Sequence, residues 1–471
     1  MSPTSSRTRA GGSRRADRRY GKFQRALVAS FVLFSLVAAS ALIAYALQGP
    51  RLRDTNFDVL RAVNTPGTAL RLYADRPLDP EALPTVSVEP AAATRVTVEG
   101  SQLTVVFLEA LRYDETYRLT ITDVREGGRS LSSTWAHEIR TPAARLLFLD
   151  RGDPGEDDRI FRVGMDGVPP EEVYRAPRIA AFTPVGSLLV VATEESSGQV
   201  SLGLVEPVTG RREDLVLPAN TTVVDLVAPA TGTTVALTLS STTPEGPYDR
   251  TLFTVDTAVG RQLVEVRDLT GSPVRATKTL VVPGRSEVIA WVDDISVVRV
   301  DLQSGLSVPI VATADQVWSV SSDGDEAVIV DVGGTVAINT QTLEQARFVA
   351  SPIGGRDVFE GDTYRTAQGE WLQKVAIPNR NGTEFVSVFV ADDGQGNSRI
   401  LYRTPDDVGS IGRFVVSPND HYIALEIVPN VRSERSDGRS LNERDRSVMT
   451  VVVDRETGSV VRSVDGFWPV W

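Results

Sequence analysis

The C-terminal two thirds of the sequence repeats one short pattern, in which two apolar runs are joined by a turn with an acidic or amide side chain. The pattern occurs seven times, with the turn residues Asp166, Glu206, Asp256, Asp301, Asn339, Asp392 and Asp454. The first and the last of these are 288 residues apart, a mean of 48 for each of six intervals. A period of about 40–50 residues built from short strands is typical of propeller blades with four strands each. We therefore predict a β-propeller of about seven blades over residues 143–471. Six or eight blades would also fit, because the blade boundaries between 351 and 388 are poorly marked.

Three turns within this region carry a second signal. They are Thr183-Pro184-Val185-Gly186, Ser321-Ser322-Asp323-Gly324 and Ser417-Pro418-Asn419-Asp420. In weakened form they resemble the Ser-Pro-Asp-Gly turns of TolB-like and WD-type propellers. The resemblance implies the same ring of blades.

The two ends of the region predict how the ring closes. Residues 145–150 (RLLFLD) are typical of the second strand of a blade that has no first strand. Residues 467–471 (FWPVW) resemble the strand that opens a TolB-like blade. Pairing of these two segments would close the ring and remove an open sheet edge. The alternative is a frayed aromatic tail.

Residues 51–142 form a separate unit, which we predict to be an Ig-like β-sandwich. Six runs fit strands, at 70–75, 86–90, 94–100, 102–107, 117–124 and 134–140. Six or seven strands in about 90 residues is the density of an Ig-like fold. The unit also resembles the bacterial Ig-like domain of the S-layer type in four motifs. These are Ala74-Asp75-Arg76-Pro77-Leu78-Asp79, Val88-Glu89-Pro90, Leu111-Arg112-Tyr113 followed by Tyr117, and Thr141-Pro142. The resemblance implies a spacer or adhesive module of the cell envelope.

The N-terminal region has the pattern of a membrane anchor. Residues 26–50 carry no charge, and eight of the 25 residues before them are Arg or Lys. About 20 apolar residues span a bilayer, and a basic flank stays on the cytoplasmic side. We therefore expect a basic cytoplasmic tail at 1–25, a transmembrane helix at 26–48, and a single-pass protein of the cell membrane with its C-terminus outside the cytoplasm. A cleaved signal peptide is the alternative, although its apolar region would be only about 7–15 residues long.

Charge and cysteine content exclude several classes of protein. The formal net charge is −12, and the first 25 residues contribute +7, which leaves −19 for the rest of the chain. Such an acidic exterior disfavours nucleic acid as a partner. The absence of cysteine excludes disulfides, thiolate metal sites and a lipid-modified cysteine. Three lysines against 46 arginines suggest a GC-rich bacterial genome.

The sequence contains no recognisable catalytic motif. The two histidines, His137 and His421, fall in different units, which excludes a histidine metal cluster. There is no Gly-x-Ser-x-Gly elbow and no phosphate-binding loop. Five carboxylates crowd one loop, namely Asp150, Asp153, Glu156, Asp157 and Asp158. They could hold a hard cation such as calcium, or they could form a solvated acidic turn. We predict no catalytic, cofactor-binding or metal-binding residue, and no cofactor.

Two long insertions indicate where a partner could bind. Residues 239–250 and 430–447 are both expected between the second and third strands of a blade, so both would lie on one face. Long loops gathered on one rim commonly form a binding surface, although the charged second insertion could equally be an idle loop. We expect a binding or scaffolding module of the cell envelope for a protein or cell-wall partner. The alternative is a hydrolase that uses propeller carboxylates on a wall polymer, a role for which paired carboxylates in the central channel would be diagnostic.

Overall fold

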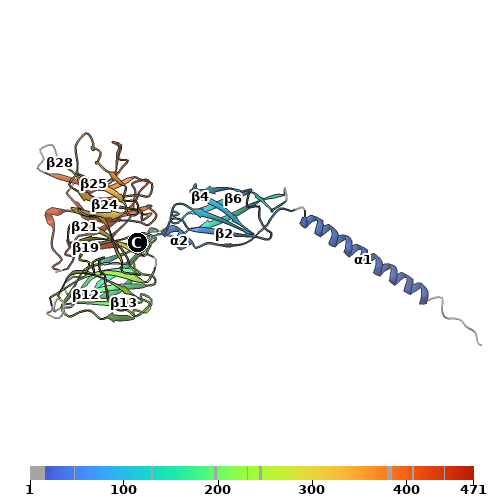
Figure 1. Ribbon diagram of the computed structural model, residues 1–471, viewed down its shortest axis with the longest axis horizontal. Coiled ribbons are helices and arrows are strands. Elements are labelled where there is room, and N and C mark those ends of the chain that lie inside the picture. The colour runs from blue at the N-terminus through green and yellow to red at the C-terminus, as the bar shows by residue number, and fades with distance from the viewer. Residues whose placement is uncertain are drawn as a thin grey trace, which may run out of the picture.

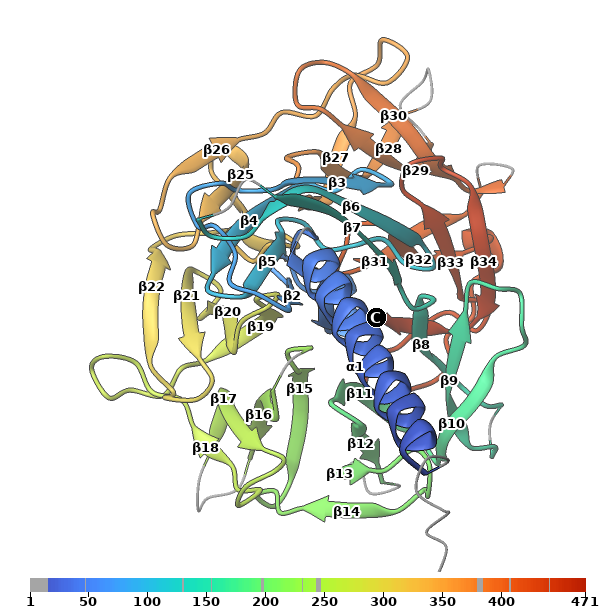
Figure 2. The same cartoon turned by 90° about the vertical axis from the view of Figure 1, so that its right-hand side faces the viewer.

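The computed structural model describes residues 16–471 except 47, 129–130, 154, 196–198, 231, 243–246, 379–383, 406–407 and 440. Within helix α1 (Ala16–Ala46) it describes the side chains of residues 25–40. Figure 1 shows three parts in a row, namely α1, a small β-sandwich and a large ring of sheets. Figure 2, turned by 90°, shows the ring of sheets with α1 in front of it.

Helix α1 corrects the expectation of a transmembrane helix at residues 26–48. Among the described residues, no helix is long and apolar enough to cross a membrane.

The sandwich consists of two antiparallel sheets with a common apolar core. Its elements are β1 (Leu52–Asn56), α2 (Val59–Asn64), β2 (Ala69–Ala74), β3 (Thr85–Glu89), β4 (Thr94–Glu99), β5 (Gln102–Phe107), β6 (Thr116–Arg125) and β7 (Ser132–Arg140). One sheet has the order β1-β2-β5-β4 and the other β3-β6-β7. Alternate residues of each central strand point inward, as Leu70 and Leu72 do in β2, because successive side chains of a strand face opposite sides. All six predicted strand segments are strands in the structure.

The ring is a β-propeller of seven four-stranded sheets, in agreement with the predicted blade number. Blade 1 contains β8 (Arg145–Asp150), β9 (Asp158–Gly164) and β10 (Glu171–Ala176), with β35 (Phe467–Val470) as its inner strand. Blade 2 is β11 (Ile179–Val185), β12 (Leu188–Glu194), β13 (Val200–Val205) and β14 (Arg212–Leu215); blade 3 is β15 (Thr221–Val227), β16 (Thr234–Ser241), β17 (Tyr248–Asp256) and β18 (Val264–Glu265). Blade 4 is β19 (Ala276–Val281), β20 (Glu287–Val292), β21 (Ser296–Asp301) and β22 (Ser307–Val311); blade 5 is β23 (Gln316–Val320), β24 (Glu326–Asp331), β25 (Gly334–Asn339) and β26 (Gln345–Arg347). Blade 6 is β27 (Phe359–Arg365), β28 (Trp371–Pro378), β29 (Phe385–Asp392) and β30 (Ser398–Arg403); blade 7 is β31 (Ser410–Val416), β32 (Tyr422–Val428), β33 (Met449–Asp454) and β34 (Val460–Asp465).

The C-terminal strand closes the ring as predicted. Strand β35 pairs antiparallel with β8, with Phe467 opposite Leu149 and Val470 opposite Leu147. Gly466 makes the sharp passage from blade 7 to blade 1 at a φ of 123°. A Cβ atom at this position would lie 2.5 Å from the carbonyl oxygen of Leu149, so the close approach of the two strands requires glycine.

The sandwich docks on one face of the propeller through an aromatic stack. The ring of Tyr113 is stacked with that of Tyr422 at 6.3 Å between centroids, and Tyr422 with Trp471 at 6.1 Å. The side-chain amide of Asn419 donates to the carbonyl of Leu111 at 2.8 Å. Residues 417–421 join the first and second strands of blade 7, so the sandwich covers the face with turns of this kind. Loops between second and third strands lie on the opposite face, which points away from the sandwich.

Candidate functional site

The insertion at 430–447 lies between β32 and β33, the second and third strands of blade 7, as predicted, and the structure describes all of it except residue 440. A short 3-10 helix, η2 (Val431–Ser433), begins it, and the carboxamide oxygen of Asn430 accepts the backbone N–H of Arg432 at 2.9 Å. Further along, the loop folds back on itself, because Ser436 and Asp445 form an isolated antiparallel bridge. The loop therefore has its own backbone structure.

Contacts with blades 1 and 2 hold this loop over the seam where the ring closes. Arg151, in the loop that follows β8, pairs with Asp437 and donates to the carbonyl oxygens of Asn442 at 2.9 Å and Leu441 at 3.0 Å. The carboxamide of Asn442 in turn donates to the carbonyl of Ala180 in β11 at 2.8 Å. These contacts join segments about 260–290 residues apart in the sequence.

A buried ion pair adds to this attachment. The guanidinium of Arg439 lies 2.6 Å from Asp158 Oδ1, and the Asp158 side chain is fully buried at the start of β9. The other oxygen of Asp158 accepts the backbone N–H of Ile179 at 2.7 Å. A buried, hydrogen-bonded pair of this kind fixes the loop in one position, because separating the two charges leaves each of them uncompensated.

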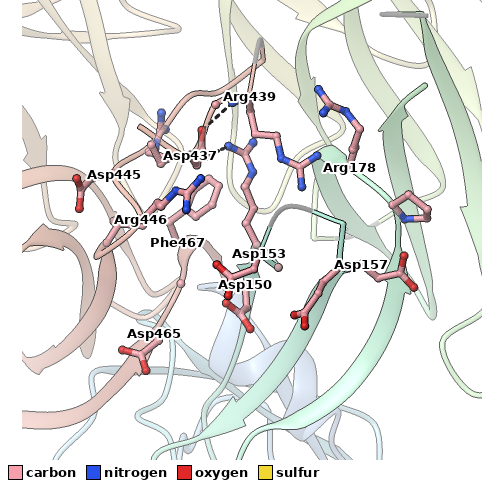
Figure 3. A pocket seen from close by; sticks show the side chains of 18 of the residues that line it. Asp150, Asp153, Asp157, Arg178, Asp437, Arg439, Asp445, Arg446, Asp465 and Phe467 are labelled. Atoms are coloured by element: carbon pink, nitrogen blue, oxygen red, sulfur yellow. Dashed lines mark hydrogen bonds and ion pairs between the residues drawn. The ribbon is translucent and has the colours of Figure 1, made fainter. Parts of the chain in front are cut away.

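The loop and the neighbouring turns enclose a cavity of about 590 Å3 on the propeller face opposite the sandwich. We call it the rim cavity; its lining includes residues 150–153, 155–157, 177–178, 437–439, 444–446, 448 and 465–467. Figure 3 shows Asp150, Asp153, Asp157 and Asp465 along one side, and Arg178 and Arg439 on the other. The cavity therefore has an acidic side, whereas the opposite side carries both arginines and the carboxylate of Asp437. Its volume falls within the range of small-molecule and side-chain binding pockets, about 300–1,000 Å3.

Burial perturbs the ionisation of groups around the rim cavity. Desolvation raises the pKa of Asp150 above its ordinary value, and Asp465 and Asp158 raise it further. The pKa of Asp158 is also raised by burial, against the opposing effect of Arg439. Burial lowers the pKa of Arg151, and its hydrogen bond to Asp437 opposes that change.

The five carboxylates that could have formed a calcium loop have different roles. Asp158 is buried against Arg439, whereas Asp153, Glu156 and Asp157 line the open cavity. Glu156 lies 3.8 Å from Arg159 in an exposed pair. No group of three or more histidine, cysteine or acidic side chains that could hold a metal ion occurs among the residues that the structure describes.

The other predicted insertion, 239–250, is much shorter than expected. Strand β16 continues to Ser241 and β17 begins at Tyr248, so the two ends of this segment, half of its residues, are paired strands of a β-hairpin. Its position between the second and third strands of blade 3 agrees with the prediction. Residues 243–246, at the tip, lie outside the described residues.

The two histidines lie in different parts of the fold, away from the rim cavity. His137 is in β7 of the sandwich. His421 lies at the junction of sandwich and propeller, where Arg112 Nη2 is 3.1 Å and Asp454 Oδ2 is 3.4 Å from His421 Nε2. Burial, followed by the charge of Arg112, lowers the pKa of His421 below its usual value. The position of His421 therefore indicates a role in holding the two parts together.

We expect acidification to weaken the protein through His421. Because its pKa is lower in the folded state, the unfolded chain takes up the proton first as the pH falls below about 6.5, and stability is lost in that window. The thermal midpoint of the wild type should therefore drop between pH 7.5 and 5.5 by more than that of His421→Gln. His137→Gln is the control for the other histidine, because burial lowers the pKa of His137 as well. Equal drops for wild type and His421→Gln would contradict this role of His421.

A second cavity, of about 490 Å3, lies in the central channel, where the inner strands of the blades meet. Its wall carries Asp225, Lys278, Asp362 and Arg413, and Lys374 reaches Asp362 at 3.5 Å. The sequence predictions missed these residues. The available signal was the rarity of lysine, because one of the three lysines in the chain, Lys278, lines this cavity and a second, Lys374, contacts Asp362 on its wall.

Comparison with known proteins finds only weak similarity to solved structures. No family model and no curated protein sequence matches the chain. Among solved structures it is similar to the β-propeller domain of the Trilobed protease from Pyrococcus furiosus, with a TM-score of 0.41 and 10% identity over 73% of this chain and 92% of that one. It is also similar to TolB from Acinetobacter baumannii, with a TM-score of 0.33 and 12% identity over 74% and 79%. A third is the dihydro-heme d1 dehydrogenase NirN in complex with DHE, with a TM-score of 0.40 and 14% identity over 69% and 74%. Because these scores are low, the seven sheets themselves establish the propeller.

Proposed function

We propose that this protein is a binding and scaffolding module whose propeller presents the rim cavity to a protein or cell-wall partner. The observation that carries the proposal is the loop at 430–447, held on blades 1 and 2 by Arg151, Arg439 and Asn442. A loop fixed in advance loses little conformational entropy when a partner binds. The rim cavity is therefore a preformed recognition surface.

The sandwich supports this proposal as a spacer. Its sheet orders, β1-β2-β5-β4 and β3-β6-β7, correspond to strands A-B-E-D and C-F-G of a constant-type Ig domain. We therefore propose that it is an Ig-like module. It leaves the loop face of the propeller uncovered, because its contacts lie on the opposite face. An extracytoplasmic location stays a prediction.

The hydrolase alternative receives less support. Asp225 already accepts hydrogen bonds from the N–H and hydroxyl of Thr279 at 2.7 and 2.5 Å and from the N–H of Leu226 at 2.9 Å. Asp362 faces the ammonium of Lys374. Glycoside hydrolysis requires one carboxyl group that gives up a proton and a second that acts on the opposite side of the bond. The hydrogen bonds from Thr279 favour a structural role for Asp225, since they join it to β19 of the next blade.

Neutralising the acidic side of the rim cavity tests the proposal. In pull-downs from an envelope extract with the full chain, Asp153→Asn/Asp157→Asn should lose about tenfold or more of the retained partner, since charged groups in a recessed interface contribute strongly. The matched control is Glu81→Gln/Glu99→Gln, which removes the same charge from exposed positions on the sandwich. Retention that is equal for wild type and the Asp153/Asp157 variant, or equally reduced by both variants, would contradict binding through the rim cavity.

A further inference from the structure

The central channel is lined by a regular set of side chains that the rim cavity does not involve. Each of the seven inner strands has a break in its pairing register. In six of them a charged or tryptophan residue lies within this break or directly after it. In order around the ring these residues are Asp225, Lys278, Trp318, Asp362, Arg413 and Trp468.

These breaks explain why the six side chains face the channel. A β-bulge bends a strand and re-aims the residue beside it, and bulges are frequent next to functional sites. The order acid, cation, tryptophan occurs on blades 3, 4 and 5 and again on blades 6, 7 and 1. The inner strand of blade 2, β11, contributes Phe182 and Thr183 instead.

The two carboxylates on the channel wall already have hydrogen-bond or ion-pair partners within the protein. Both oxygens of Asp225 accept hydrogen bonds from Thr279 and Leu226, as described above. Asp362 is paired with Lys374, whose ammonium also lies 3.4 Å from the carbonyl oxygen of Gly412. Neither carboxylate therefore needs a ligand to satisfy it.

The donors on the wall are less completely used. In the described part of the chain, Arg413 has no ion pair or hydrogen bond; its guanidinium lies over the ring of Trp468, 4.8 Å from the centroid. Lys278 donates to the carbonyls of Val317 at 2.8 Å and Trp318 at 3.3 Å, which leaves one N–H of the ammonium free. The cavity wall carries two cations and two carboxylates, and Lys374 pairs with one of these carboxylates, Asp362, although the chain as a whole is acidic.

We propose that the central channel binds a small carboxylate that carries a ring, with Arg413 and Lys278 donating to the carboxylate and Trp318 and Trp468 lining the ring. Guanidinium groups bind carboxylates through two parallel hydrogen bonds, and contact with the ring of Trp468 restrains the guanidinium of Arg413 in advance. Tryptophan faces pack well against flat or weakly polar rings. A cavity of about 490 Å3 has room for one such molecule.

An aromatic acid and a sugar acid both combine a carboxylate with a ring. A binding experiment can distinguish between these two kinds of ligand. Phenylacetate and D-glucuronate are the two probes, and phenylacetamide and D-glucose are their uncharged counterparts. Binding to the full chain is followed by isothermal calorimetry and by tryptophan fluorescence, at low and at high salt. We expect one of the two acids to bind with a salt-dependent affinity, and its neutral counterpart to bind at least about tenfold more weakly.

Variants assign the binding to the channel. Arg413→Gln and Lys278→Met should each weaken binding of the acid by about tenfold or more, since each removes a charged donor. The matched control, Arg95→Gln, removes an exposed arginine from the sandwich and should bind as the wild type does. Unchanged thermal midpoints show that the variants are folded. Arg413→Lys keeps the charge but loses the paired N–H donors of the guanidinium, so its affinity for the acid should lie between those of Arg413→Gln and the wild type. The proposal is overturned if neither acid binds at up to about 10 mM, if the neutral counterpart binds equally well, or if Arg413→Gln binds as tightly as the wild type. Because none of these readouts involves the rim cavity, they are independent of the partner pull-down.

Discussion

Deletion of residues 467–471 is expected to abolish cooperative unfolding of the propeller. Strand β35 is the inner strand of blade 1, and without it β8 exposes a row of unpaired backbone groups to the channel. The side chain of Phe467 is 2% exposed and lies under the guanidinium of Arg151 at 4.8 Å. The backbone N–H of Trp468 donates to Glu426 in blade 7 at 2.9 Å. Loss of this strand therefore removes both pairing and packing at the seam.

Substitutions at Phe467 measure the contribution of side-chain packing without shortening the chain. Phe467→Ala should lower the free energy of unfolding by about 3–5 kcal/mol, the usual cost of emptying a buried aromatic site, whereas Phe467→Leu should cost less. The measurement is urea unfolding of the full chain, followed by circular dichroism and tryptophan fluorescence. Val208→Ala is the control, because Val208 is 93% exposed. A truncated chain that unfolds with the same midpoint and slope as the wild type would show that ring closure does not stabilise the fold.

The sequence predicted the ring because each blade is a local structure. The turn residues from Asp166 to Asp454 repeat at a regular interval, and neighbouring strands of a blade are joined by short turns. Closure was also predictable, because residues 145–150 lacked a partner strand and residues 467–471 offered one. Signals of this kind depend only on spacing and on the alternation of apolar residues.

The hairpin at 239–250 was harder to predict. Its Ser, Thr and Gly residues are typical of a loop, but serine and threonine are also compatible with strands when a neighbour supplies the pairing. In the structure, Ser241 pairs with Tyr248 next to the tip of the hairpin. Pairing between strands therefore overrode the local composition.

The candidate sites could not be predicted in detail, for two physical reasons. The rim cavity depends on contacts between residues such as Arg439 and Asp158, which are 281 positions apart and meet only when the ring is closed. The channel wall depends on the register of strand pairing, since a shift of one residue turns a side chain to the other face. Arg413, which lines the channel, lies at an irregularity in the pairing register between Ile411 and Phe414.

Removal of the carboxylate of Asp158 is expected to destabilise the protein strongly and to release the loop at 430–447 from blade 1. Asp158→Ala leaves the guanidinium of Arg439, a side chain that is 11% exposed, without its partner and the backbone N–H of Ile179 without an acceptor. Breaking a buried pair from one side costs about 3–5 kcal/mol, because the remaining charge stays desolvated. The loop at 430–447 should then become more accessible to trypsin, since Arg439 is no longer held against blade 1.

A double-mutant cycle tests whether the pair acts as a unit. Asp158→Asn and Arg439→Gln should each lower the free energy of urea unfolding, and the double variant should lose less than the sum of the two, with a coupling of about 0.5–3 kcal/mol. The control is Arg432→Gln at the start of the same loop, where the pair with Glu384 is 71% and 69% exposed and should contribute less than about 1 kcal/mol. Other contacts must hold the loop at 430–447 if the losses in free energy of unfolding are additive. The same holds if the loop resists trypsin in Asp158→Ala as it does in the wild type. If the expected coupling is found, partner retention in the pull-down should fall together with loop protection, because the same ion pair would then shape the recognition surface.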